Sequence, residues 1–86
     1  MRLLWDDRAW EEYCAWQQED KKTLKRINNL LKEIARTPYQ GTGKPEPLKN
    51  NMSKWWSRRI DSCNRIVYRQ FDESTILIAS CKNHYN

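Results

Sequence analysis

Four side chains of the sequence have types and positions suited to acid–base chemistry on an anion. Glu46 stands between two prolines, which restrict the backbone and remove amide donors, so its carboxylate is held rigidly and left free to accept a proton. Arg59 and Arg65 flank an expected hairpin connection, so their guanidinium groups can reach one anion. His84, the single histidine, lies near the C-terminal end of the sequence and could donate a proton.

Each of these residues alone also fits an ordinary interpretation: an exposed loop glutamate, a solvated arginine face, a histidine in a fraying tail. Together they supply the base, the guanidinium cluster and the acid that metal-free RNA cleavage needs. The base would take the proton of the ribose 2′-OH, which attacks the adjacent phosphate, and the acid would protonate the leaving 5′-oxygen. Because DNA lacks the 2′-OH, such a site would be selective for RNA.

The distribution of charge also favours a polyanionic partner. The 86 residues carry a formal net charge of +5. Residues 1–20 hold two basic and six acidic side chains, a net charge of −4, whereas residues 21–86 hold 14 basic and 5 acidic side chains, a net charge of +9. We therefore expect the basic body to meet the polyanion and the acidic N-terminal fifth to lie away from it.

Composition excludes several classes of protein. No apolar run approaches 18 residues and no signal segment opens the chain, so we expect a cytoplasmic protein without a membrane span. Cys14, Cys63 and Cys81 include no C-x-x-C pair, which predicts small buried thiols in a reducing compartment, with no disulfide and no metal site. The length predicts a single domain over residues 1–86, with a shallow groove rather than an enclosed pocket as its active site.

Two amphipathic helices are predicted in the first half of the chain. Apolar residues at three- and four-residue spacing indicate a helix from about residue 7 to 18, with Asp6 as its N-cap, and a second helix, with Asp20 as its N-cap, that ends near Arg36. The stretch from Tyr39 to Lys54, rich in glycine and proline, predicts a loop with at most a short extended piece. The tight connection between the helices favours an antiparallel hairpin.

Alternation of period two predicts strands around these helices. The expected strands cover residues 2–5, 56–60, 65–71 and 75–81. The element order β-α-α-β-β-β predicts a small α+β domain, an antiparallel twisted sheet with the helix hairpin on one face.

Several motifs carry a resemblance to a known family, and they run nearly end to end. They are L-x-W…W-x-x-Y…W-Q…D-K-K, then R-T-P-Y-x-G-x-G-K-P-E-P-L-K (36–49), W-S-R-R-I (56–60), R-I-V-Y (65–68) and H-Y (84–85). The chain resembles the YoeB/Txe family of bacterial toxins, in the RelE superfamily of ribosome-dependent mRNA interferases.

The resemblance implies roles for the matching residues. Glu46 would be the general base, Arg65 the stabiliser of the transferring phosphate and His84 the general acid. Tyr85 would hold or stack the substrate, and the matching cations would contact phosphate: Lys44, Lys49 and Arg59. The resemblance further implies cleavage of mRNA in the A site of the 70S ribosome, no cofactor, a YefM/Axe-like antitoxin and room for a homodimer.

Two other functions fit part of the pattern. A gyrase-directed, ParE-like toxin would share the fold without the catalytic set. A small RNA-binding protein would use Trp55, Trp56 and Tyr85 as stacking platforms; because neighbouring strand residues face opposite ways, at least one of the two tryptophans should belong to the core.

The cations around Glu46 should hold its pKa at or below the usual value, so we expect little cleavage of free RNA.

Overall fold

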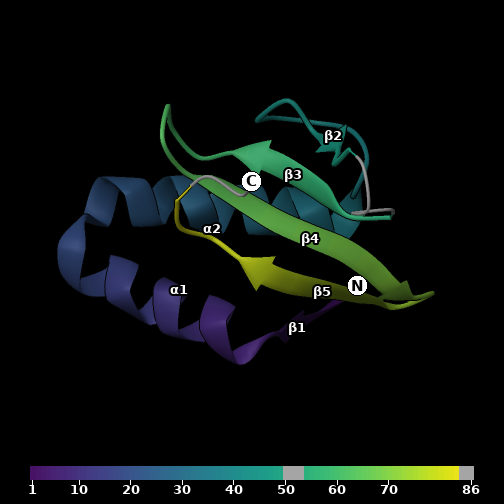
Figure 1. Ribbon diagram of the computed structural model, residues 1–86, viewed down its shortest axis with the longest axis horizontal. Helices are drawn as coiled ribbons and strands as arrows, with labels where there is room; N and C mark the ends of the chain where they lie inside the picture. Colours follow the sequence, from purple (N-terminus) through teal and green to yellow (C-terminus); the bar gives the residue numbers. More distant parts are fainter. Residues whose placement is uncertain (50–53, 84–86) are drawn as a thin grey trace.

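The helices and strands follow the sequence pattern closely. The computed structural model describes residues 1–49 and 54–83. Within these ranges the elements are β1 (Arg2–Trp5), α1 (Asp7–Glu19), α2 (Lys21–Arg36), β2 (Glu46–Pro47), β3 (Trp56–Arg59), β4 (Arg65–Asp72) and β5 (Thr75–Ser80). Both helices lie on one face of the sheet (Figure 1), which confirms the α+β class. Neither helix is long and apolar enough to cross a membrane.

The sheet is mixed rather than wholly antiparallel. Its strand order is β1-β5-β4-β3-β2, in which β2 to β5 form an antiparallel meander. The first strand pairs in parallel with the last, with Arg2 opposite Thr75 and Trp5 opposite Ile78. The alternating pattern that predicted the strands could not distinguish these cases, because the side-chain period is two in both kinds of pairing.

The core lies between α2 and the central strands. Its fully buried side chains include Ile27, Leu30 and Ile34 of the helix and Ile66, Tyr68, Ile76 and Ile78 of β4 and β5. Trp56 packs against this cluster, as expected for one of the adjacent tryptophans.

The two expected helix caps behave differently. The carboxylate of Asp20 accepts hydrogen bonds from the amides of Lys22 and Thr23 at 3.0 and 3.2 Å. Hydrogen bonds from the Thr23 side chain and backbone are the largest causes that lower the pKa of Asp20. Asp6 occupies the N-cap position of α1, but its side chain makes no capping hydrogen bond.

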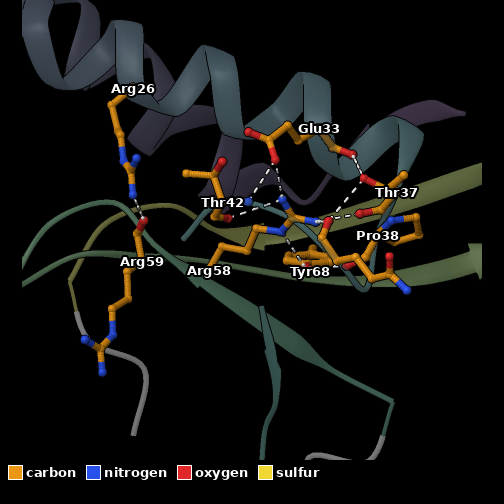
Figure 2. Close-up of polar contacts among 9 residues, drawn as sticks. Arg26, Glu33, Thr37, Pro38, Thr42, Arg58, Arg59 and Tyr68 are labelled. Atoms are coloured by element: carbon orange, nitrogen blue, oxygen red, sulfur yellow. Dashed lines mark hydrogen bonds and ion pairs between the residues drawn. The ribbon is translucent and has the colours of Figure 1, made fainter. Parts of the chain in front are cut away.

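Arg58 is a fully buried cation beneath the end of α2 (Figure 2). It shares the core-facing side of β3 with Trp56, as the alternation requires. Its guanidinium donates to the Tyr68 hydroxyl at 3.2 Å and to the Glu33 carboxylate at 3.3 Å. It also donates to three backbone carbonyls of the loop after α2, those of Thr37, Gln40 and Thr42. Through these hydrogen bonds Arg58, a residue of β3, joins the loop after α2 to the sheet.

The cysteines only partly match the expectation. Cys81 is buried, and burial raises the pKa of its thiol to about 12. Cys14 is half-buried and Cys63 is exposed in the turn between β3 and β4, so the expectation of buried thiols is wrong for Cys63. A hairpin turn at the surface has no core neighbours to cover its side chains.

Replacement of the buried arginine is expected to destabilise the fold. Arg58→Met would leave the loop carbonyls and the Glu33 carboxylate without their donor, which typically costs about 3–5 kcal/mol when one partner of a buried charged network is removed. Arg59→Met changes the neighbouring, exposed side chain and should stay within about 0.5 kcal/mol. Urea denaturation of both variants measures the difference, and equal midpoints would contradict this role of Arg58.

Candidate functional site

Glu46 lies on the edge strand β2, next to β3. The strand is only two residues long and Glu46 pairs with Ser57. An edge strand can contain proline because its outer amides need no partner, so the short extended piece expected from the sequence is confirmed. The Glu46 side chain is 51% exposed and therefore accessible to a ligand.

Backbone hydrogen bonds hold the segment around Glu46 on both sides. Before it, the amide of Arg59 donates to the carbonyl of Gly43 at 2.7 Å; after it, the amide of Leu48 donates to Trp55 at 2.9 Å. Gly43 has φ +87°, and a Cβ there would lie 3.1 Å from the carbonyl oxygen of Arg59. The glycine thus permits both the turn and the close approach.

Arg65 connects the base candidate to the sheet. It begins β4 opposite Arg59, which confirms that the two arginines are cross-strand neighbours. Nη1 of Arg65 donates to Oε1 of Glu46 at 2.7 Å and to Oγ of the buried Ser57 at 3.3 Å. Ser57 is not among the site residues expected from the sequence. The alternation of β3 nevertheless puts it on the same face of the sheet as Arg59, which could have indicated it.

The two arginines open onto a shallow hollow of about 250 Å³, which Asp61 and Ser62 also line. The carboxylate of Asp61 accepts hydrogen bonds from the amides of Cys63 and Asn64 at 2.8 and 2.7 Å. Burial tends to raise the pKa of Asp61, but these hydrogen bonds outweigh it and the pKa is lowered. Asp61 thus shapes the turn, while the hollow retains two guanidinium groups for an anion.

The remaining cations divide into two groups. Lys49 and Arg59 lie close enough to Glu46 to help lower its pKa. Lys44 is exposed in the preceding loop, in a left-handed conformation with φ +51°. It forms no hydrogen bond or ion pair with the described site residues, so its phosphate contact stays a prediction.

His84 and Tyr85 lie outside the described residues, and their roles also stay predictions. The residue before them is held at the beginning of β4. The amide of Asn83 donates to the side-chain oxygen of Asn64 at 2.6 Å, and the amide of Arg65 donates to the carbonyl of Asn83 at 3.4 Å. Asn83, the last described residue, therefore lies beside Arg65.

The ion pair sets the protonation state of Glu46. The hydrogen bond from Arg65 is the largest cause and lowers the pKa of Glu46. Burial is the second largest and raises it, and the smaller effects of the charges of Arg65, Arg59 and Lys49 lower it further. The carboxylate is therefore ionised at neutral pH. Within residues 1–49 and 54–83 no three His, Cys, Asp or Glu side chains are grouped to hold a metal ion.

A helix pair on one face of a five-stranded mixed sheet is the fold of the RelE-type toxins. The family model described as "YoeB-like toxin of bacterial type II toxin-antitoxin system" matches residues 5–85. The chain belongs to this YoeB toxin family.

Individual relatives agree with this assignment over nearly the full length. Toxin YoeB of Escherichia coli K12 is 51% identical over 85 residues, which cover 99% of this chain and all of the relative. The structure of a "YoeB/ParE toxin" from Agrobacterium tumefaciens has a TM-score of 0.93 at 41% identity, covering 99% of this chain and 100% of that chain.

Two structures from Staphylococcus aureus bear on assembly. A YoeB dimer has a TM-score of 0.90, and a heterotetrameric YoeB–YefM toxin–antitoxin complex has a TM-score of 0.88. Both are 46% identical to this chain, and each match covers 99% of this chain and 98% of the other.

Replacement of Arg65 should raise the pKa of Glu46. In Arg65→Met the carboxylate of Glu46 loses its hydrogen bond and its nearest positive charge, so its pKa should rise toward the usual value. Titration of the Glu46 side-chain carboxyl by ¹³C NMR measures this change. Arg2→Met, which removes an exposed arginine on the far edge of the sheet, is the matched control. An unchanged titration in Arg65→Met would mean that the ion pair does not form in solution.

Proposed function

We propose that this type II toxin is a ribosome-dependent endoribonuclease that cleaves mRNA in the ribosomal A site and so inhibits translation. The observation that carries the proposal is the 2.7 Å contact between Nη1 of Arg65 and Oε1 of Glu46. It brings a proton acceptor and an anion-binding group together on an open sheet face, beside a hollow lined by a second arginine.

In this mechanism the RNA supplies its own nucleophile. Glu46 removes the proton from a ribose 2′-OH, and the 2′-oxygen attacks the adjacent phosphorus. Arg65, with Arg59 opposite it, stabilises the charge that gathers on the phosphorane. His84 donates a proton to the departing 5′-oxygen. The bond between phosphorus and this oxygen breaks, which gives a 2′,3′-cyclic phosphate and a 5′-hydroxyl, with no cofactor in the scheme.

The ion pair also supports dependence on the ribosome. In the free toxin Arg65 stabilises the ionised form of Glu46, which makes the carboxylate a weak base. A scissile phosphate placed in the hollow competes for Arg65, and its own negative charge raises the proton affinity of Glu46. The ribosome would contribute by fixing the message so that the 2′-oxygen, the phosphorus and the 5′-oxygen are in line.

Cleavage of a translated message tests the proposal directly. The wild-type protein should produce 5′-hydroxyl ends on ribosome-bound mRNA and cut the same RNA much more slowly without ribosomes. Glu46→Gln should lower the rate by about 10²–10⁴-fold, as expected for loss of one proton-transfer group. Glu73→Gln, an exposed glutamate in the turn between β4 and β5, is the matched control.

The chemistry of the cleaved ends decides between mechanisms. Mapping the ends by ligation distinguishes a 5′-hydroxyl from a 5′-phosphate. A 5′-phosphate, or equal cleavage of naked and ribosome-bound RNA, would contradict the proposed mechanism.

The expected protein partner is a YefM/Axe-like antitoxin, which the Staphylococcus aureus complex supports. The basic face favours an acidic segment that folds on binding and covers Arg59 and Arg65. The Staphylococcus aureus YoeB dimer supports a homodimer as a further assembly.

Charge reversal on this face should weaken the antitoxin complex. Arg59→Glu places a negative charge at the hollow and should lower the affinity by about tenfold at low salt, chiefly through slower association. Arg2→Glu makes the same change away from the site and should have little effect. Surface plasmon resonance with the cognate antitoxin measures both variants. Equal affinities would exclude occlusion of the hollow as the mode of inhibition.

A further inference from the structure

The open face of β3 and β4 extends beyond the residues assigned so far. The register pairs Arg59 with Arg65 and Ser57 with Val67, and continuing it by one step on the same face brings Trp55 opposite Arg69. The guanidinium carbon of Arg69 lies 5.5 Å from the centroid of the Trp55 ring. The open face therefore carries a pair of arginines at one end and a tryptophan–arginine pair at the other.

Within residues 1–49 and 54–83, Arg69 has Trp55 as a ring partner but no hydrogen-bond acceptor or carboxylate of the kind that a structural arginine usually contacts. Its Nε is buried and makes no hydrogen bond with the part of the chain that the structure describes. It also forms no ion pair there, whereas Arg58 and Arg65 each contact a carboxylate. Among the described residues no carboxylate therefore competes with an incoming anion for the guanidinium of Arg69. Arg69 and Trp55 are both half-buried, so part of each side chain stays accessible.

We propose that Trp55 and Arg69 form a second subsite, which binds a nucleotide of single-stranded RNA next to the one held at Glu46 and Arg65. The indole would stack on a base, and the guanidinium would bind a phosphate or a base oxygen. This subsite rests on the proposed function and names a further part of the substrate that the site would hold.

The spacing of the face fits an extended strand of RNA. Arg65 and Arg69 are four residues apart on β4, which corresponds to about 13 Å along a strand. The guanidinium of Arg65 turns to Glu46 and that of Arg69 lies over Trp55, so the two face different neighbours and Arg69 can meet a neighbouring part of the same strand. Stacking on aromatic side chains combined with a cationic track is the usual way in which proteins hold single-stranded RNA without reading its sequence.

Binding of short, uncleavable RNA tests the subsite separately from catalysis. The probes are fluorescein-labelled 2′-O-methyl oligoribonucleotides, a dinucleotide and a hexanucleotide, which lack the nucleophile. The wild-type protein should bind the hexanucleotide more tightly in fluorescence anisotropy. Trp55→Ala and Arg69→Ala should each weaken hexanucleotide binding by about tenfold and leave the dinucleotide almost unaffected. Trp55→Phe, which keeps an aromatic face, should retain most of the difference.

Matched controls separate the subsite from general charge and from other ligands. Trp10→Ala removes an exposed tryptophan and Arg2→Ala an exposed arginine, both from the acidic N-terminal fifth, and neither should change the affinity for RNA. A hexaglutamate peptide offers negative charge without bases. If Trp55→Ala weakens this peptide as much as the RNA, the face is a protein-binding surface and the proposal is overturned.

The proposal is also overturned if the wild-type protein binds the hexanucleotide no more tightly than the dinucleotide, or if Trp55→Ala and Arg69→Ala leave the difference unchanged. Failure of the proposed function gives another result: the wild-type protein would not cleave ribosome-bound mRNA, whatever its preference for RNA length.

Discussion

The buried guanidinium of Arg58 is the constraint on which the site depends. A charged group without solvent contact must have its donors satisfied, and here a loop folds over it to supply three backbone carbonyls between residues 37 and 42. Glu33 adds its carboxylate from α2, and a hydrogen bond from the Thr42 amide is the largest cause that lowers the pKa of Glu33. This loop (Figure 2) is followed after a few residues by β2, which carries Glu46, so the pairing of Arg58 supports the segment that positions Glu46.

The first helix, α1, holds the segment that follows β5, as α2 and Arg58 hold the loop before β2. The indole of Trp16 donates to the carbonyl of Cys81 at 2.8 Å, and the carboxylate of Glu12 accepts from the Cys81 amide at 2.8 Å. These contacts join α1 to the end of β5, and the contacts of Asn83 with Asn64 and Arg65 place that residue at the start of β4. The second helix thus supports the loop before Glu46, and the first helix supports the segment that follows β5.

Much of the architecture was predictable from sequence because it depends on local periodicity. The spacing of apolar residues gave both helices nearly to the residue, and alternation gave the strands and made Arg59 and Arg65 neighbours across a short hairpin. The two prolines beside Glu46 predict at most a short extended piece, and the two-residue strand β2 confirms this. The roles expected for Glu46, Arg65 and His84 rest on their combination of residue types and on the family resemblance, since single residues of these types are common on protein surfaces.

The sequence by itself therefore determined which residues share a face of each helix or strand, and the excess of positive charge after residue 20. Tertiary structure alone decided that β1 runs parallel to β5, that Arg58 is buried while Arg59 is exposed, that Glu46 pairs with Arg65, and that Arg69 lies against Trp55. The physical reason is the range of the interactions. Helical and strand periods are set by neighbours within a few residues, whereas these contacts join segments that meet only after the sheet has formed and packed against the helices.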